Sequence, residues 1–597
     1  MPTSTAPATD RSPEHRPAGA PGSAPRAPFL ARLRGRNLPV TAVLLAILAV
    51  LVLVPLVLIV WQSLTNAPPG EGASFTFEKI TQAYGTSSIL PLIRNSAEFA
   101  VGSTVVAFVI GTGLAYLTER TNVPFRRLAY GLILFPLVVP GTVTTTAWML
   151  LLDKNVGLLN YLLTLVGVHQ PIFSAYSMWS MIWMQGADRF ALPFLLMAAA
   201  FRTLDPGLEE ASAMSGASFP RTFRTVTLPV LRPAIVACLL ILFVENLETF
   251  EVPGIIGIPA HIPVFATYVY LLSNNVPFDV NLASAVSLSY IAIALIAVWV
   301  YYRSIRQAER FAVVGGKNFR PDRLELHGAR KWVTAGVMHL VLLVTVVLPL
   351  AMLVYLSLLS YYHTPAHGGV PPLSLASYRW VLDTPEVSSA FVTNAEVGIV
   401  SGLAAMLLAA VIAWVVVRTK APGRRLIDGL AFAPIAIPGT VLGLALAAVY
   451  LAVPIGVYGT IWILVIAYVS KYVSYAVRAT HSSLTQVDGS LEEAATAAGA
   501  GGFRVFRTVT LPLIAPGALV AFLYVVTLTF KALSLPIMLT SANATMLPVL
   551  TYNTIQAGNY SDVAALGVVT TVGLAVLTGI SALVSRRFGV ARISGAL

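Results

Sequence analysis

The chain has 597 residues, of which 57% are hydrophobic and only 11% are charged, and its mean hydropathy is +0.79. This composition excludes a soluble globular protein, because many apolar stretches of about 20 residues or more are each long enough to span a bilayer. The formal net charge of +12 does not indicate nucleic-acid binding, since most Lys and Arg residues lie in alternate loops, as is typical of the cytoplasmic side of a membrane protein.

The chain is predicted to begin with a disordered cytoplasmic tail, residues 1–37, which is rich in Pro, Ala, Ser and Thr. The first apolar run is too long for the hydrophobic region of a signal peptide and lacks a clear cleavage site. We therefore expect it to remain as a membrane anchor. The single cysteine, Cys238, lies in an apolar run and is expected to be a small core residue.

The apolar runs predict about twelve transmembrane helices in two halves. Residues 38–302 form the first half, residues 332–597 the second, and a linker with eight Lys or Arg residues, 303–331, joins them. The predicted spans are 38–64, 96–117, 128–152, 174–201, 230–255 and 283–302, then 333–359, 396–417, 426–451, 459–477, 517–538 and 563–584. Because each half has six spans and starts inside, the halves are expected to be parallel repeats about an axis along the membrane normal.

One polar loop occurs twice in the sequence. It reads EASAMSGASFPRTFRTVTLP at 210–229 and EAATAAGAGGFRVFRTVTLP at 493–512, and the last seven residues are identical. The copies lie 283 residues apart, one in each half, and each lies between two apolar runs. A shorter echo also supports duplication, since Pro-Gly-Thr at 140–142 recurs at 438–440.

Each copy is predicted to form a short helix followed by a turn. Asp205 suits the helix start in the first copy, and in the second either Asp488 or Ser490 can cap, Ser490 with capping-box spacing. Gly216 and Gly499 then allow the backbone to turn. We interpret a short helix held outside the membrane between two spans as a docking element, and the alternative is an ordinary amphipathic loop.

The two loops resemble the cytoplasmic EAA loop of permease subunits in binding-protein-dependent ABC importers. The departures are mild, with Ser212 in place of Ala, and Val226 and Val509 in place of Ile. In that family the loop forms a coupling helix that sits in a groove of the ATP-binding subunit. The resemblance therefore implies an all-α polytopic membrane protein with the type I ABC importer permease fold. The residues that it assigns to coupling are Glu210, Ala211, Gly216, Leu228, Pro229, Glu493, Ala494, Gly499, Leu511 and Pro512.

Two such loops in one chain imply a fused permease that engages two copies of an ABC ATPase subunit. No Walker motif occurs in the chain, so ATP and Mg²⁺ are expected on the ATPase subunits and no cofactor on this chain. No nucleophile, base or metal constellation indicates an enzyme. We expect a transport subunit of the bacterial inner membrane, with both termini in the cytoplasm, that works with an extracytoplasmic solute-binding protein and binds no nucleic acid.

Ionisable residues inside predicted spans are costly in lipid and are expected to face a cavity or a partner. At the offset of the repeat, Asp188 corresponds to Lys471 and Glu248 to Lys531, so related positions carry opposite charges. We therefore expect either ion pairs between the halves, such as Glu248 with Lys531, or a polar lining about the axis. Pairing with unrelated neighbours and snorkelling are the alternatives. The candidate residues of the translocation path are Asp188, Glu245, Glu248, Glu251, Lys471 and Lys531.

The cargo is predicted from a second resemblance. The fused twelve-span plan with Glu-Thr-Phe-Glu-Val-Pro at 248–253 is similar to permeases usually classed with iron(III) importers, although the second half has Lys-Ala-Leu-Ser at 531–534 in place of an acidic residue. Thiamine, polyamine and phosphonate or other anion importers share this architecture and are alternatives. An ion-coupled secondary carrier, with the intramembrane acids as proton sites, is the alternative from another class.

Overall fold

The computed structural model describes residues 38–67, 71–72, 74–85, 89–274, 278–308, 324–362, 372–453, 455–541 and 544–587. In these ranges the protein is built of helices, and β-type pairing is limited to three isolated bridges. The predicted tail, 1–37, and the middle of the predicted linker, 309–323, lie outside the described residues. The predicted all-α fold is confirmed for the part that the structure describes.

The first half contains long apolar helices separated by short polar ones. Apolar helices suit a bilayer because each satisfies its backbone hydrogen bonds internally. In chain order the elements are α2 (Leu38–Leu48), η1 (Ala49–Leu53), α3 (Val54–Ser63), α4 (Glu78–Gly85), α5 (Ile89–Arg120), α6 (Arg126–Leu134), η2 (Phe135–Leu137), α7 (Gly141–Leu152), α8 (Leu158–Leu165), α9 (Met178–Arg189), α10 (Ala191–Thr203), α11 (Pro206–Met214), α12 (Phe219–Thr222), η3 (Phe223–Thr227), α13 (Leu228–Glu248), η4 (Pro253–Gly257), α14 (Phe265–Asn274) and α15 (Val280–Ala308).

The second half repeats the same order of long and short helices. The elements are α16 (Gly328–Leu342), η6 (Leu343–Val347), α17 (Leu348–Ser357), α18 (Ala376–Asp383), α19 (Pro385–Arg418), α20 (Arg424–Phe432), η8 (Ala433–Ala436), α21 (Gly439–Ala452), α22 (Ile461–Thr485), α23 (Ser490–Ala497), α24 (Gly502–Val505), η9 (Phe506–Thr510), α25 (Leu511–Lys531), η10 (Pro536–Met538), α26 (Leu547–Gln556) and α27 (Tyr560–Arg587). Between α21 and α22 the described residues of this half contain no counterpart of α8.

The predicted third and ninth spans are broken helices, which corrects the continuous spans expected from the sequence. The chain bends by 105° between η2 and α7, and by 110° between η8 and α21. Pro140 and Pro438 lie at the two breaks. Proline has no amide hydrogen with which to continue a helix, and it disfavours the helical conformation in the residue before it. The repeated Pro-Gly-Thr motif is therefore the cause of both bends.

The predicted fifth and eleventh spans also end earlier than expected. α13 ends at Glu248 and α25 at Lys531, each seven residues before the predicted boundary. The residues that follow, Thr249 and Ala532, have extended backbone angles, and the chain continues through the short turns η4 and η10. These turns lie between the long helices and the short helices α14 and α26.

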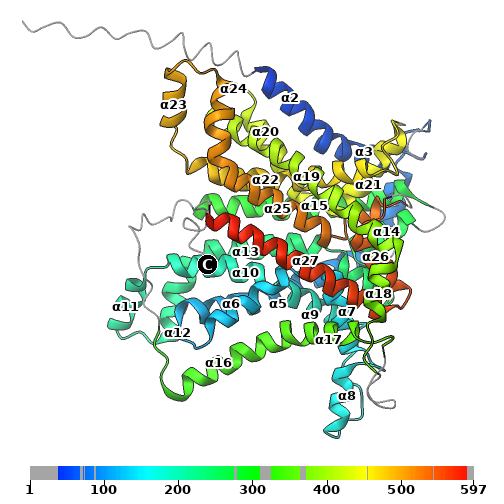
Figure 1. Ribbon diagram of the computed structural model, residues 1–597, viewed down its shortest axis with the longest axis vertical. Helices are drawn as coiled ribbons and strands as arrows, with labels where there is room; N and C mark the ends of the chain where they lie inside the picture. The colour runs from blue at the N-terminus through cyan, green and yellow to red at the C-terminus, as the bar shows by residue number, and fades with distance from the viewer. Residues whose placement is uncertain are drawn as a thin grey trace, which may run out of the picture.

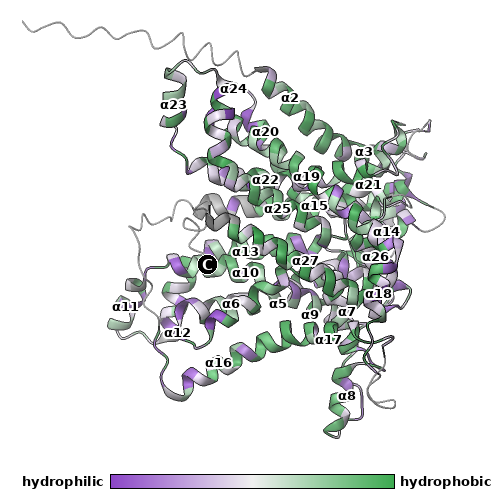
Figure 2. Cartoon of the chain, in the orientation of Figure 1, coloured by the Kyte–Doolittle hydropathy of each residue, from purple (hydrophilic) through white to green (hydrophobic). Residues whose placement is uncertain are grey.

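The number of spans agrees with the prediction of about twelve. Among the described residues, nine helices are long and apolar enough to cross a membrane, or up to 11 if each bent pair counts as one span. α9 and α10 form another apolar segment, which is interrupted at Phe190 because Pro193 cannot donate a hydrogen bond to the carbonyl of Arg189. Figure 2 shows apolar residues along the long helices and hydrophilic residues gathered toward the two ends of the molecule.

The two halves exchange their first spans. α2 and α3 of the first half pack against α20 and α21 of the second, and α16 and α17 of the second half pack against α6 and α7 of the first. Each exchange has a buried apolar core, with Leu48 and Val52 among second-half residues and Met338 and Leu342 among first-half residues. Each half therefore contributes to the hydrophobic core of the other.

The duplicated loops lie at one end of the molecule. α11 and α23, which begin the two copies, project at the left of Figure 1 on either side of the helix bundle, and the end of α27 points toward the same side. The short helices α14 and α26 lie at the opposite end (Figure 1). α13 and α25 run from the loop end into the bundle and so connect the two loops to its centre.

Candidate functional site

The first docking helix, α11, begins as predicted at Asp205. The Asp205 carboxylate accepts a hydrogen bond from the Gly207 amide at 2.9 Å, and Pro206 occupies the first turn, where its missing amide hydrogen costs nothing. The helix is followed by Gly216, which has a φ of +80°. Glycine adopts this left-handed conformation without steric cost, so the predicted turn is confirmed.

The second docking helix, α23, is capped by Asp488 and not by Ser490. The Asp488 carboxylate accepts a hydrogen bond from the Ser490 amide at 2.9 Å, and this bond lowers the pKa of Asp488. Ser490 is itself the first residue of the helix, so the capping box considered from its spacing does not form. Gly499 follows with a φ of +87°, which reproduces the turn at Gly216.

The predicted coupling residues of both loops are brought to equivalent places. Glu210 and Ala211 on α11 are exposed, as are Glu493 and Ala494 on α23. Met214 beside them is 89% exposed. The four residues therefore form a free outer face on each docking helix, accessible to a partner.

The identical segments Phe223–Thr227 and Phe506–Thr510 each form one wide π-helical turn, η3 and η9. Each turn leads into Leu-Pro, with Leu228 and Pro229 opening α13 and Leu511 and Pro512 opening α25. Since proline cannot donate the next backbone hydrogen bond, the helix is locally widened before it. The predicted Leu-Pro positions thus mark the joint between each docking loop and a membrane helix.

The inner face of each docking helix is anchored by the glutamate before the predicted one. The Glu209 carboxylate forms an ion pair with Arg120 at the end of α5 and accepts a hydrogen bond from Thr227 Oγ1 at 2.6 Å. Glu492 makes the equivalent contacts, with Thr510 Oγ1 at 2.8 Å and Arg418 Nε at 3.4 Å.

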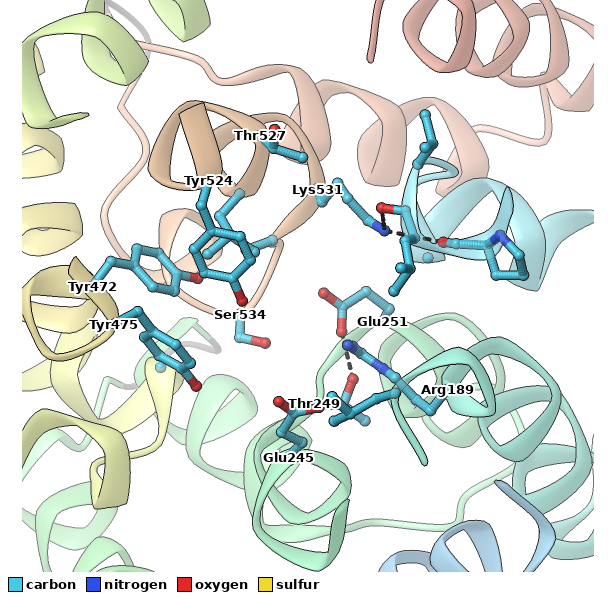
Figure 3. A pocket seen from close by; sticks show the side chains of 18 of the residues that line it. Arg189, Glu245, Thr249, Glu251, Tyr472, Tyr475, Tyr524, Thr527, Lys531 and Ser534 are labelled. Carbon is cyan, nitrogen blue, oxygen red and sulfur yellow. Dashed lines mark hydrogen bonds between the residues drawn. The ribbon is translucent and has the colours of Figure 1, made fainter. Parts of the chain in front are cut away.

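A cavity of about 390 Å³ lies between the two halves, and its wall contains all six predicted path residues. The labelled side chains of Figure 3 converge on it from α9, α13 and the segment after α13 in the first half, and from α22, α25 and the segment after α25 in the second. Other lining residues come from the broken spans and from α27. The prediction that these charges face a shared space between the halves agrees with this geometry.

The expected ion pair between Glu248 and Lys531 is wrong. Glu248 pairs instead with Lys471, whose Nζ atom lies 2.5 Å from the carboxylate, and which also donates to the Ile437 carbonyl at 2.6 Å. Lys531 crosses to the first half and donates to the carbonyls of Leu137 at 2.7 Å and Pro136 at 3.2 Å. These carbonyls belong to the broken third span, where the helix end leaves oxygens without backbone donors. Lys531 therefore binds these carbonyl oxygens and not the Glu248 carboxylate.

The other two hydrogen-bonded carboxylates, Glu251 and Asp188, lie next to places where a span is broken or ends. Glu251 accepts hydrogen bonds from Thr249 Oγ1 at 2.6 Å, from the amide of Phe250 and, across the interface, from the amide of Leu533 at 3.2 Å. Asp188 accepts from Thr144 Oγ1 at 3.0 Å. In the ranges that the structure describes, no group of three or more His, Cys, Asp or Glu residues is arranged to hold a metal ion.

The sequence matches the model of one protein family in both halves, at residues 86–310 and 398–590. That family is the binding-protein-dependent transport system inner membrane component. The chain belongs to this family. It is accordingly a multi-pass membrane permease of an ABC importer and not an enzyme.

Curated relatives of the permease cover most of its length. It is 26% identical over 471 residues to a putative ferric transport system permease of Haemophilus influenzae, covering 76% of this chain and 70% of that protein. It is 25% identical over 511 residues to a ferric transport system permease of Actinobacillus pleuropneumoniae, covering 83% and 71%. A solved bacterial ABC transporter that imports the polysaccharide alginate overlaps 40% of this chain and 85% of its own chain, with 19% sequence identity and a TM-score of 0.33.

Sequence reasoning missed three sets of residues at the sites of the permease. Glu209 and Glu492 could have been found, because Leu-Glu-Glu-Ala precedes both turns and both glutamates are shared by the copies. Arg189, next to Asp188, was likewise visible as a charge inside a predicted span. Three tyrosines of the cavity wall, Tyr472, Tyr475 and Tyr524, had no signal in the sequence, because their positions depend on how α22 and α25 pack.

Proposed function

We propose that the permease imports iron(III), delivered by an extracytoplasmic binding protein and driven by two ATPase subunits. The cargo is supported by relatives named as ferric transport permeases, which together span about three quarters of this chain or more. The family description itself names dependence on a binding protein. The observation that carries the ATPase count is the pair of docking helices, each with a free outer face and the same anchored inner face.

Coupling in this proposal runs from the docking helices to the cavity. ATP and Mg²⁺ bind on the ATPase subunits and draw them together, and each subunit moves the helix seated in it. The glutamates that anchor α11 and α23 pass this motion to α5 and α19 through Arg120 and Arg418, and to η3 and η9 through Thr227 and Thr510. α13 and α25 continue from those turns to the cavity, so motion at the loops changes its walls.

The orientation of the permease follows from its charges. The basic loops, including both docking loops, face the cytoplasm of a bacterium by the positive-inside rule, and both termini lie on that side. Beyond the ends of α13 and α25, away from the docking loops, one buried apolar cluster contains Phe250 and Ile255 of the first half and Leu533 and Ile537 of the second. This arrangement supports a state in which the cargo path is shut toward the binding protein.

The test is transport by the purified permease in proteoliposomes together with the ATPase subunit and the binding protein of the same importer. Uptake of iron(III) should require ATP, and the ATPase should copurify at two copies per chain. Uptake of putrescine or thiamine in place of iron would overturn the cargo alone. Uptake driven by a proton gradient without ATP would overturn the importer mechanism.

A further inference from the structure

One carboxylate in the cavity has no partner. Glu248, Glu251 and Asp188 each accept a hydrogen bond from a neighbour, but Glu245, one turn before Glu248 on α13, has none with any described residue. Figure 3 shows its side chain at the edge of the cavity, across from the tyrosines of the second half. A carboxylate left unpaired inside a membrane protein is costly, so its retention here indicates a ligand.

Three tyrosines form the wall that faces it. The ring centroids of Tyr472 and Tyr475 lie 6.1 Å apart, and those of Tyr475 and Tyr524 lie 5.7 Å apart. None of their hydroxyl groups is hydrogen-bonded to a described residue, although Tyr472 is only 8% exposed. In Figure 3 the hydroxyl of Tyr475 points toward the side of Glu245, and that of Tyr524 points toward the middle of the space. The wall therefore offers phenol oxygens that the protein itself leaves unused.

The charge of the lining favours a cation. Four carboxylates line the cavity against three cationic side chains, Arg189, Lys471 and Lys531. Lys471 is paired with Glu248, Lys531 binds backbone carbonyls, and Arg189 lies 3.7 Å from the Asp188 carboxylate with no hydrogen bond to its Nε atom. Four carboxylates against three cations leave one net negative charge on the lining, and Glu245 is the carboxylate without a hydrogen bond or ion pair to a described residue. A low-dielectric wall strengthens its field.

We propose that Glu245 and the phenol oxygens of Tyr475 and Tyr524, with Tyr472 behind them, form a transit site for iron(III) inside the permease. The inference rests on the proposed cargo and adds the residues that hold it between the binding protein and the cytoplasm. A hard cation takes oxygen ligands, and tyrosine is an established ligand of iron(III). Each phenol that coordinates as phenolate gives up its proton to water, and no change of oxidation state is involved.

The orientation of the rings separates this site from one for an organic cation. An ammonium group is held over the faces of aromatic rings, whereas Tyr475 and Tyr524 present their hydroxyl groups to the cavity (Figure 3). No group of three or more His, Cys, Asp or Glu residues in the described ranges could hold a metal ion, so a metal site in this cavity would need the phenol oxygens. The mixed set of one carboxylate and neighbouring phenols is the arrangement that the geometry offers a metal.

The experiment titrates the purified permease in detergent with iron(III) nitrilotriacetate and follows the visible charge-transfer band of iron-bound phenolate. The wild-type protein should develop the band, and Tyr475→Phe with Tyr524→Phe should abolish it. Glu245→Gln should weaken iron(III) binding by about tenfold or more. Tyr176→Phe and Glu396→Gln, which change residues outside the cavity lining, should leave band and affinity unchanged.

Transport assays show whether the proposed transit site alone is wrong or whether the proposed cargo is wrong as well. The same variants are assayed for ATP-driven iron(III) uptake in proteoliposomes, with thermal unfolding to show that they are folded. Iron uptake by the wild type with no band, or a band that survives both tyrosine changes, would overturn the transit site while leaving the proposed function intact. Uptake of putrescine without iron uptake, inhibited by Glu245→Gln, would overturn both and assign the cavity to an organic cation.

Discussion

The ion pair between Glu248 and Lys471 shows how single residues hold the two halves together. Lys471 is 3% exposed, and its two hydrogen bonds reach Glu248 in the first half and Ile437 in its own. Removing one member of a buried pair leaves the other charge unpaired. We therefore expect Lys471→Met to lower the free energy of unfolding by about 3–5 kcal/mol. Thermal unfolding of the purified permease in detergent measures the loss.

Double variants provide the control for this pair. Glu248→Gln combined with Lys471→Met removes both charges and should recover much of the stability that Lys471→Met loses. Glu248→Gln combined with Lys531→Met should be no more stable than Lys531→Met alone, since Lys531 binds the carbonyls of Pro136 and Leu137 and not Glu248. Equal destabilisation by Lys471→Met alone and by the first double variant would contradict the pairing.

The anchoring glutamates allow another test at the same scale. Glu209→Gln and Glu492→Gln remove the charge that binds Arg120 and Arg418, and each should cost about 1.5–3 kcal/mol at its anchor. We expect the ATPase still to bind, because the outer faces are unchanged, but its stimulation by the loaded binding protein to fall sharply. ATP hydrolysis by the reconstituted importer is the measurement.

The neighbouring exposed glutamates are the matched control for the anchors. Glu210→Gln and Glu493→Gln leave the ion pairs in place, so they should weaken the attachment of the ATPase before they affect the stability of the permease. If the Glu209 and Glu210 variants behaved alike in both assays, the distinction between an anchored inner face and a free outer face would fail.

At the scale of secondary structure, each docking helix depends on the turn that ends it. Gly216 and Gly499 have positive φ angles, and a Cβ atom added at either would meet nothing within 4 Å. The cost of Gly216→Val or Gly499→Val is therefore a backbone cost of about 1–2 kcal/mol for each left-handed residue. Gly→Asn at the same positions should cost less, because asparagine tolerates this conformation. Copurification of the ATPase should fall for valine and be nearly retained for asparagine, and equal losses would indicate that side-chain size matters instead.

The breaks in the spans show what could be predicted at this scale and what could not. Hydropathy located the segments because a polar residue is costly at almost any position inside the bilayer, so each span is a long run of apolar residues. It joined 128–152 into one span because composition alone does not report the bend at Pro140, although the proline itself was in view. The early ends at Glu248 and Lys531 were missed for a different reason. The residues beyond them are apolar, and only the packing of η4 and η10 turns them away from the helix axis.

For the whole molecule, duplication predicted the arrangement in two repeated halves but not which charged residues pair between the halves. Both docking helices, both π-helical turns and both broken spans obey the repeat. The charges do not: Lys471 and Lys531 stand where the first half has Asp188 and Glu248, and each makes different contacts. Lys531 was matched to Glu248 by position, but the carbonyls at the end of η2 lie closer to it, and such backbone acceptors are invisible in a sequence. The tyrosine wall was missed because it belongs to one half only.

The exchange of first spans makes a prediction for the molecule as a whole. Because α2 and α3 complete the core of the second half, and α16 and α17 that of the first, neither half can bury its apolar surface alone. Residues 1–308 and 324–597, expressed together as two polypeptides, should associate and copurify through a tag on one of them. Each expressed alone should be degraded or aggregate. Deletion of 38–67 from the first polypeptide should greatly weaken copurification, since it removes the span that crosses to the other half. Either half purifying alone with the thermal stability of the full chain would show that the exchange is not required for folding.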